Sequence, residues 1–205
     1  MKRRARAFVI ATALAALLAA GSATWASASP AWRFNGEQLQ GKETILGGAT
    51  GAQLTFAGLT TTCEGFLYMM KVENSAGVGK GETTYLPIFD CTTSGACSVE
   101  RAEAEELPWP TPLASVSGKN YVTFKNVHVL IEYGGEECVV EGIEFDIQGT
   151  MGALFDNVTE TMTFNSSSFE KTKTELKTFS MKVELSAVLG AEAFGPHLGE
   201  AVTVS

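Results

Sequence analysis

The feature of this sequence that most constrains its fold is a two-residue alternation of apolar and polar side chains. Between Phe179 and Ala187, every second residue is apolar and the residues between them are polar or charged. The same alternation runs through Ile143–Ile147, and glycines stand close to both ends of that run. Successive side chains of a β-strand point to opposite faces, so this pattern predicts strands with one buried face.

Other runs are rich in Thr, Val, Ile, Phe and Tyr, which fit a pleated surface, and they predict further strands. These runs are Gln53–Phe56, Thr61–Val72, Thr83–Asp90, Tyr121–Tyr133, Val158–Phe164 and Ala201–Ser205. Turn-forming residues lie between the apolar runs, at Asn35-Gly36, Gly47-Gly48, Asn74–Gly77, Ser117–Asn120 and Gly134-Gly135. We expect the strand before Gly134-Gly135 to turn there and to pair with the strand through residues 138–148.

No window after residue 28 shows the 3.6-residue period of a helix. The segment Ser98–Leu107 is acidic and almost without an apolar face, so we expect a loop or one exposed helical turn there. The sequence therefore predicts an all-β fold in a single domain over residues 29–205. We expect an antiparallel two-sheet β-sandwich, with an open β-barrel as the alternative.

The first 28 residues have the organisation of a signal peptide. Four basic residues within positions 2–6 precede the apolar stretch Ala7–Ala20, and Ala26-Ser27-Ala28 supplies a small-residue cleavage site. The apolar stretch is shorter than the roughly 20 residues that span a bilayer. We expect a mature chain that begins at Ser29 and is secreted or associated with the cell envelope. The export route, general secretory or twin-arginine, stays open.

The charge of the chain argues against two classes of partner. The whole sequence has 15 basic and 23 acidic residues and a net charge of −8. Removal of residues 1–28 would leave 11 basic residues and a net charge of −12. We therefore expect no nucleic-acid partner and no binding to anionic lipid.

The cysteines of the mature chain are Cys63, Cys91, Cys97 and Cys138. An even number in an exported protein predicts two disulfides. Three connectivities are possible, and we favour Cys91 with Cys97, across a short apparent loop, and Cys63 with Cys138. A zinc site is poorly supported, because no second close cysteine pair or histidine pair accompanies them.

The segment Leu107–Pro112 holds three prolines, which remove backbone donors and exclude a central strand. We expect a connection between the two halves of the sheet. Trp109, between two of these prolines, is the best candidate for an aromatic binding residue, because an exposed ring stacks on sugars or on partner side chains. The alternative is that Trp109 closes an open end of the fold.

Residues suited to catalysis are few. His128 lies in a predicted strand, where a structural role is expected, and His197 follows Gly195-Pro196 in a turn. No G-x-S-x-G nucleophile motif occurs, and oxidised cysteines would leave no thiol nucleophile. Paired carboxylates are the main enzymatic alternative; the candidates are Glu132, Glu136, Glu137, Glu141, Glu144 and Asp146. Because Glu144 and Asp146 alternate with apolar residues, a solvated strand face explains them better. We expect no catalytic residue, cofactor or metal.

The order of these features resembles an uncharacterised family of secreted β-rich proteins from high-GC Gram-positive bacteria. The residues that carry the resemblance are the leader, Trp32 with Asn35-Gly36, Cys63 with its strand, Phe89-Asp90-Cys91 with Cys97, and Cys138 with Val140-Glu141-Gly142. The resemblance implies export and a β-rich fold, and it implies no activity.

From the sequence we expect a non-enzymatic extracellular or envelope-associated binding or structural protein, whose partner is an unknown ligand or glycan. The alternative is a secreted carbohydrate-active hydrolase that uses paired carboxylates. A flat aromatic patch would favour the first, and two carboxylates across a deep cleft would favour the second.

Overall fold

The computed structural model describes residues 29–56, 59–138, 144–165, 171–173, 178–179 and 184–205. The predicted signal peptide and residues 180–183 of the strand predicted at Phe179–Ala187 lie outside these residues. The described residues form strands and one short 3-10 helix, Gly195–His197. The all-β prediction is confirmed.

The strands in chain order are β1 (Trp32–Phe34), β2 (Glu37–Gln38), β3 (Lys42–Ala49), β4 (Ala52–Phe56), β5 (Leu59–Ser75), β6 (Val78–Tyr85), β7 (Ile88–Thr93), β8 (Ser98–Ala104), β9 (Trp109–Pro110), β10 (Leu113–Val116), β11 (Lys119–Gly134), β12 (Glu144–Asp156), β13 (Thr161–Asn165), β14 (Lys171–Lys173), β15 (Thr178–Phe179), β16 (Glu184–Gly190), β17 (Glu192–Phe194) and β18 (Val202–Val204).

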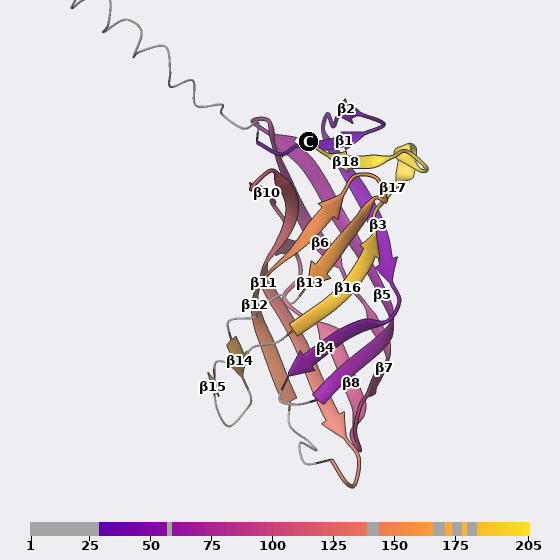
Figure 1. The fold of residues 1–205 in the computed structure, drawn as a ribbon, viewed down its shortest axis with the longest axis vertical. Helices are drawn as coiled ribbons and strands as arrows, with labels where there is room; N and C mark the ends of the chain where they lie inside the picture. Colours follow the sequence, from indigo (N-terminus) through magenta and orange to yellow (C-terminus); the bar gives the residue numbers. More distant parts are fainter. Residues whose placement is uncertain (1–28, 57–58, 139–143, 166–170, 174–177, 180–183) are drawn as a thin grey trace, which may run out of the picture.

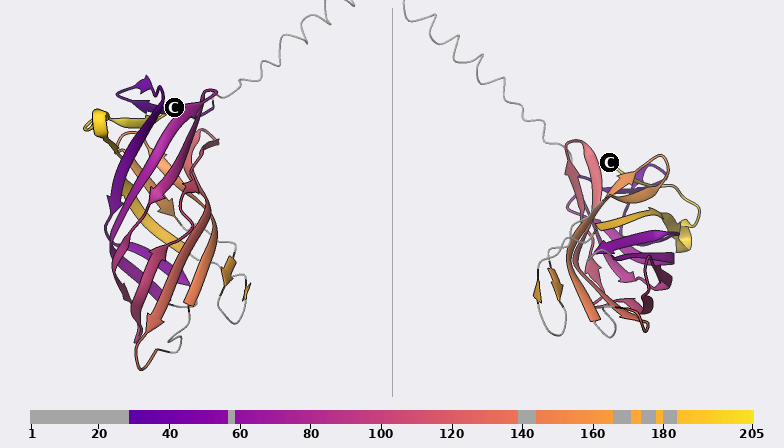
Figure 2. Two further views of the ribbon diagram at one scale, coloured as in Figure 1. Left: turned by 180° about the vertical axis from the view of Figure 1, so that it is seen from behind. Right: turned by 60° about the horizontal axis from the view of Figure 1, so that its bottom comes forward.

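One antiparallel sheet of 15 strands makes up most of the molecule, with the neighbour order β10-β11-β12-β13-β16-β4-β5-β3-β17. Strands β6 and β7 also pair with β5, and β8 pairs with β11. Because β7 and β8 follow each other and lie in contact, they lead from the β5 wall to the β11 wall. The sheet therefore curls into a half-barrel (Figures 1 and 2), the form of the open barrel considered from the sequence.

The proline-rich segment Leu107–Pro112 connects the two walls, as predicted, and is called the seam below. Strand β9 pairs with β6, through Thr83 opposite Trp109. Beyond it, the Thr111 amide donates to the Gly81 carbonyl at 2.7 Å, and the Thr123 amide of β11 donates to the Pro112 carbonyl at 3.0 Å. The segment thus links β6 to β11 without serving as a central strand.

A three-stranded sheet, β18-β1-β2, closes one end of the half-barrel (Figure 1). In its register Trp32 lies opposite Val204, and both are fully buried. Asparagine side chains tie this sheet to the barrel. Asn157 accepts from the Val204 amide at 2.7 Å and donates to the Val204 carbonyl at 2.8 Å, and Asn74 binds both backbone groups of Trp32.

Several strand predictions are confirmed. The runs Gln53–Phe56, Thr61–Val72 and Tyr121–Tyr133 lie within β4, β5 and β11, and β11 pairs with β12 as predicted. The run Thr83–Asp90 contains two strands instead of one, because β6 ends at Tyr85 and β7 begins at Ile88. The run predicted from Val158 starts its strand only at Thr161, because the Asp156 carboxylate accepts from the Val158 amide at 2.7 Å and holds a turn.

Two local predictions are wrong. Gly47-Gly48 is not a turn but lies inside β3, where a side chain on Gly47 would come within 1.9 Å of the Gly190 carbonyl oxygen. The glycine there permits a close approach of two backbones. The segment predicted as a loop or helical turn at Ser98–Leu107 contains strand β8, because its acidic side chains face outward and its backbone pairs with β11.

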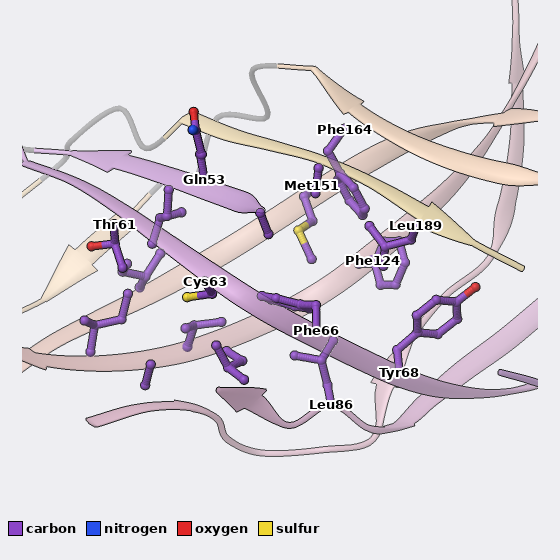
Figure 3. A pocket seen from close by; sticks show the side chains of 18 of the residues that line it. Gln53, Thr61, Cys63, Phe66, Tyr68, Leu86, Phe124, Met151, Phe164 and Leu189 are labelled. Carbon is purple, nitrogen blue, oxygen red and sulfur yellow. The ribbon is translucent and has the colours of Figure 1, made fainter. Parts of the chain in front are cut away.

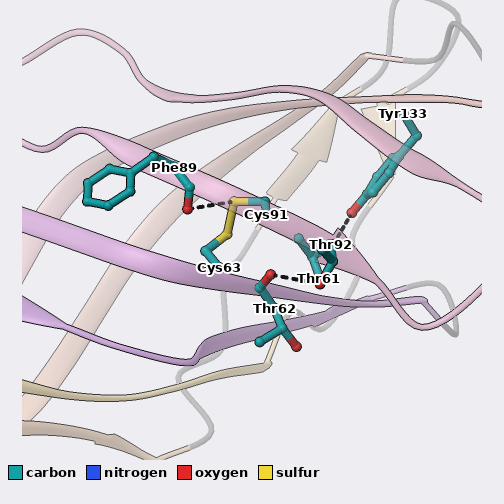
Figure 4. Close-up of a disulfide and its surroundings, with 7 residues drawn as sticks. All are labelled: Thr61, Thr62, Cys63, Phe89, Cys91, Thr92 and Tyr133. Carbon is teal, nitrogen blue, oxygen red and sulfur yellow. Dashed lines mark hydrogen bonds between the residues drawn. A yellow bond between two sulfur atoms is a disulfide. The ribbon is translucent and has the colours of Figure 1, made fainter.

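The prediction that all four cysteines are oxidised is confirmed, but the predicted connectivity is wrong. The bridges join Cys63 with Cys91 and Cys97 with Cys138. Cys91 lies in β7 directly opposite Cys63 of β5, as Figure 4 shows. Cys91 is held in strand β7, whereas Cys97 lies in the turn between β7 and β8. From there Cys97 bonds to Cys138, which follows β11. The register of β5 and β7 therefore decides the pairing of Cys91, and not its short distance along the chain from Cys97.

Candidate functional site

An apolar cavity of about 60 Å³ lies between the walls of the half-barrel (Figure 3). Its lining comes from most strands of the curled sheet. The lining residues are Ala52, Gln53, Leu54, Thr61, Cys63, Phe66, Tyr68, Leu86, Ile88, Ala102, Trp109, Phe124, Val129, Ile131, Ile147, Met151, Phe164, Ala187 and Leu189. None of these side chains is ionisable at neutral pH, so the cavity offers an almost wholly carbon surface.

A change in side-chain alternation along β5 shapes one wall of the cavity. In the first part of β5, the odd-numbered Thr61 and Cys63 face the cavity, whereas further along the even-numbered Phe66 and Tyr68 do. The partner strand β7 is irregular opposite this change, because Asp90 has a positive φ of 53°. The strand can therefore present the Phe66 ring to the cavity and still bury Cys63 beside its disulfide partner.

Two tyrosine hydroxyls border the apolar interior and are both hydrogen-bonded. Tyr68 donates to the Gly190 carbonyl at 2.8 Å, and the Tyr133 hydroxyl lies 2.6 Å from Thr61 Oγ1. Burial raises the pKa of Tyr68 well above its usual range, with a smaller contribution from the charge of Glu192. Burial also raises the pKa of Tyr133, and the hydrogen bond with Thr61 opposes it in part. Both phenols therefore stay neutral and add no charge to the interior.

Trp109, the predicted binding aromatic, is fully buried and offers no exposed stacking platform. Its indole Nε1 donates to the Glu105 carbonyl at 2.8 Å, and its ring forms part of the cavity wall. Among the described residues, the exposed aromatic rings are instead Tyr85, Phe89 and Phe194. Sequence reasoning missed Tyr85 and Phe89 because residues 83–90 were predicted as one strand, whereas β6 ends at Tyr85 and β7 begins at Ile88.

Two of the carboxylates considered for catalysis bind one arginine on the outer face of the sheet. Glu132 of β11 lies opposite Glu144 of β12, and both bind Arg101 of β8. Arg101 also pairs with Glu103 at 3.1 Å. Glu136 and Glu137 are exposed after β11, and Glu141 lies outside the described residues. Glu144 and Asp146 share one strand face, as predicted.

His128 is buried beside three carboxylates. Its Nε2 lies 2.5 Å from Asp146 Oδ1 and 3.7 Å from Glu105 Oε2, and its Nδ1 lies 3.4 Å from Glu106 Oε2. A bulge between Phe124 and Val127 precedes it in β11. The expected structural role agrees with this burial, because the imidazole links β11 to β12 and to the turn after β8.

His197 lies in the 3-10 helix, far from His128 in sequence. It contacts Glu200 at 3.0 Å and Glu43 of β3 at 3.2 Å. The hydrogen bond with Glu200 is the main cause of a raised pKa, and the charge of Glu43 adds to it. This histidine attaches the segment after β17 to β3.

Within the described part of the chain, no three His, Cys, Asp or Glu side chains are grouped so as to hold a metal ion. No helix among those residues is long and apolar enough to cross a membrane. Comparison with protein-family models, with curated proteins and with solved structures found no match.

Proposed function

We propose that this chain is an exported, non-enzymatic binding protein that holds a small apolar molecule, or the end of an alkyl chain, inside its half-barrel. The observation that carries the proposal is the apolar cavity between the β5 and β11 walls. A single water needs about 10–15 Å³ of such space, and an apolar cavity of about 150 Å³ takes up benzene or xenon. The 60 Å³ cavity suits a few carbon atoms.

The lining allows the cavity to widen. Met151, whose side chain is unbranched and adaptable, forms part of the wall, together with Leu86 and Leu189 (Figure 3). A ligand larger than the empty space would be admitted by movement of these side chains. An apolar ligand would not be repelled, because the hydroxyls of the lining residues Tyr68 and Thr61 already have hydrogen-bond partners.

Support for export comes from the leader organisation of residues 1–28 and from the two disulfides. Intact-mass analysis of the product recovered outside the cell tests this part. We expect a chain that begins at Ser29 and carries four oxidised cysteines. Recovery of the full-length chain alone would contradict the export proposal and leave the cavity proposal untouched.

A titration with xenon, benzene and n-hexane, followed by methyl NMR, tests the cavity. We expect saturable shifts confined to Met151, Leu189 and their neighbours. Ala102→Leu should abolish them, because the added carbon atoms enter the cavity from β8. Ala96→Leu is the matched control, since Ala96 is exposed in the turn between β7 and β8.

The outcomes are separable from misfolding. The spectrum of the Ala102→Leu variant must keep the dispersion of the native protein, and its loss of binding then reports on the cavity. Absence of saturable shifts with all three probes in the native protein would refute the proposal. Equal loss in the Ala96→Leu control would show that the shifts do not report on this cavity.

The hydrolase alternative has less support. Glu132 and Glu144 do not face each other across a cleft but share the cation of Arg101. Release of reducing sugar from a polysaccharide panel, lost on Glu144→Gln, would overturn the non-enzymatic part of the proposal.

A further inference from the structure

A second feature, separate from the apolar cavity, is a groove that gathers four lysines of an acidic protein. The groove has a volume of about 300 Å³ and is lined by Lys42, Lys71, Lys80 and Lys125, with two glutamates among them. The lysines come from β3, β5, β6 and β11, so no stretch of sequence shows them together. The whole chain has a net charge of −8, which makes a concentration of lysines in one groove unexpected.

Strand register explains three of these positions. Lys42 of β3 and Lys80 of β6 both lie opposite Glu73 of β5, and Lys71 lies opposite Glu82. Residues in register point to the same face of a sheet, so these side chains share the outer face. Lys125 reaches the groove from the bulge in β11 between Phe124 and Val127. A bulge often redirects a side chain in this way.

The lysines of the groove are only partly neutralised. Lys42 Nζ lies 3.6 Å from Glu73 Oε2, in an exposed pair. Lys71, Lys80 and Lys125 make no ion pair with a described residue. With Glu82 also facing the groove, four positive charges stand against two negative ones. At physiological ionic strength, charges beyond about 8 Å are largely screened, so the groove presents a local positive potential despite the acidic surface elsewhere.

The remaining lining is apolar or backbone. Pro110 and Pro112 of the seam form one side, and Val72 and Gly81 contribute to the groove from β5 and β6. A side chain on Gly81 would come within 2.8 Å of Thr111 Oγ1, so glycine at this position lets the seam segment pack against β6. The groove is therefore a feature of the seam that closes the half-barrel.

We propose that this groove binds the oxyanion group of a small phosphorylated or sulfated ligand. Several lysine ammonium groups around one groove supply the point charges that such a group requires. A small ligand is favoured over a nucleic acid, because a long polyanion would extend beyond the groove onto a surface of net negative charge.

The test uses inorganic phosphate and inorganic sulfate as probes, titrated at constant ionic strength against chloride and followed by amide NMR. We expect saturable shifts at Lys71, Gly81 and Lys125 with either or both oxyanions. Lys71→Gln and Lys125→Gln should each weaken binding by about two- to fivefold, the range of a single exposed ion pair. Lys119→Gln is the matched control, because Lys119 is an exposed lysine outside the groove.

Two results would overturn the proposal. One is the absence of saturation by phosphate and by sulfate, and the other is an equal loss of affinity in the Lys119→Gln control. A preference for one oxyanion would identify which ester the ligand carries. Tighter binding of a single-stranded oligonucleotide than of phosphate, abolished by the same lysine variants, would overturn the restriction to small ligands.

Discussion

Asn74 should hold the end sheet on the half-barrel, and its replacement is the sharpest test of how that end is closed. Its Oδ1 accepts from the Trp32 amide at 2.8 Å, and its Nδ2 donates to the carbonyls of Trp32 at 2.9 Å and Leu39 at 3.1 Å. A hydrogen bond of this kind contributes about 1 kcal/mol net. Asn74→Ala should therefore lower the free energy of unfolding by about 3 kcal/mol, a large part of the 5–15 kcal/mol typical of a domain.

A second substitution separates hydrogen bonding from packing. Asn74→Asp keeps the acceptor for the Trp32 amide but places an oxygen opposite two carbonyl oxygens. It should destabilise at least as much as Asn74→Ala, although its size is closer to that of asparagine. Gln40→Ala is the control, because Gln40 donates one bond of 3.3 Å to the Gln38 carbonyl at an exposed position. Its effect should stay below about 0.5 kcal/mol.

Urea denaturation followed by tryptophan fluorescence measures all three variants, since Trp32, in β1 of the end sheet, is fully buried. A loss below about 0.5 kcal/mol for Asn74→Ala would refute the reasoning, and so would an Asp variant more stable than the Ala variant. Either result would mean that burial of Trp32 and its neighbours closes this end without help from the asparagine.

Three further predictions address the covalent, electrostatic and seam contacts. Replacing Cys97 and Cys138 together by serine removes a disulfide of sequence separation 41. In the chain-entropy model this should lower the unfolding free energy, measured by urea denaturation, by about 4 kcal/mol. Peptide mapping of the native protein should recover this disulfide, and a Cys91–Cys97 peptide would contradict it. Because the pKa of His197 is raised in the folded protein, its stabilising contribution should be complete below about pH 6.5 and should disappear as the pH rises through the folded pKa. The difference in unfolding free energy between the native protein and His197→Gln should shrink over that pH window. A pH-independent difference would contradict the prediction. Trp109→Phe keeps an aromatic ring in the seam but removes the donor to the Glu105 carbonyl, so urea denaturation should show a loss of about 1–3 kcal/mol, and no loss would mean that this hydrogen bond is dispensable.

The sequence by itself determined the local structure wherever one face of a strand is buried. The strands β11 and β12 and their antiparallel pairing followed from alternation and from Gly134-Gly135, because the period of two and the turn residues are both local properties. Alternation did not reveal β8, because the residues between its outward-facing glutamates are small, such as Ala102, and give no clear apolar pattern. The turn predicted from the glycine pair failed at Gly47, where glycine permits a close contact between two backbones.

Only the tertiary structure decided which distant residues meet. Cys63 pairs with Cys91 because β5 and β7 place them in register, and no spacing along the chain specifies that register. The cavity depends on the change of alternation in β5 and on side chains from both walls of the curled sheet. The groove of Lys71 and Lys125 depends on a seam that joins β6 to β11. These contacts follow from sheet order and curvature, which arise from the packing of the whole chain, whereas an alternating pattern reports only on each strand and its own two faces.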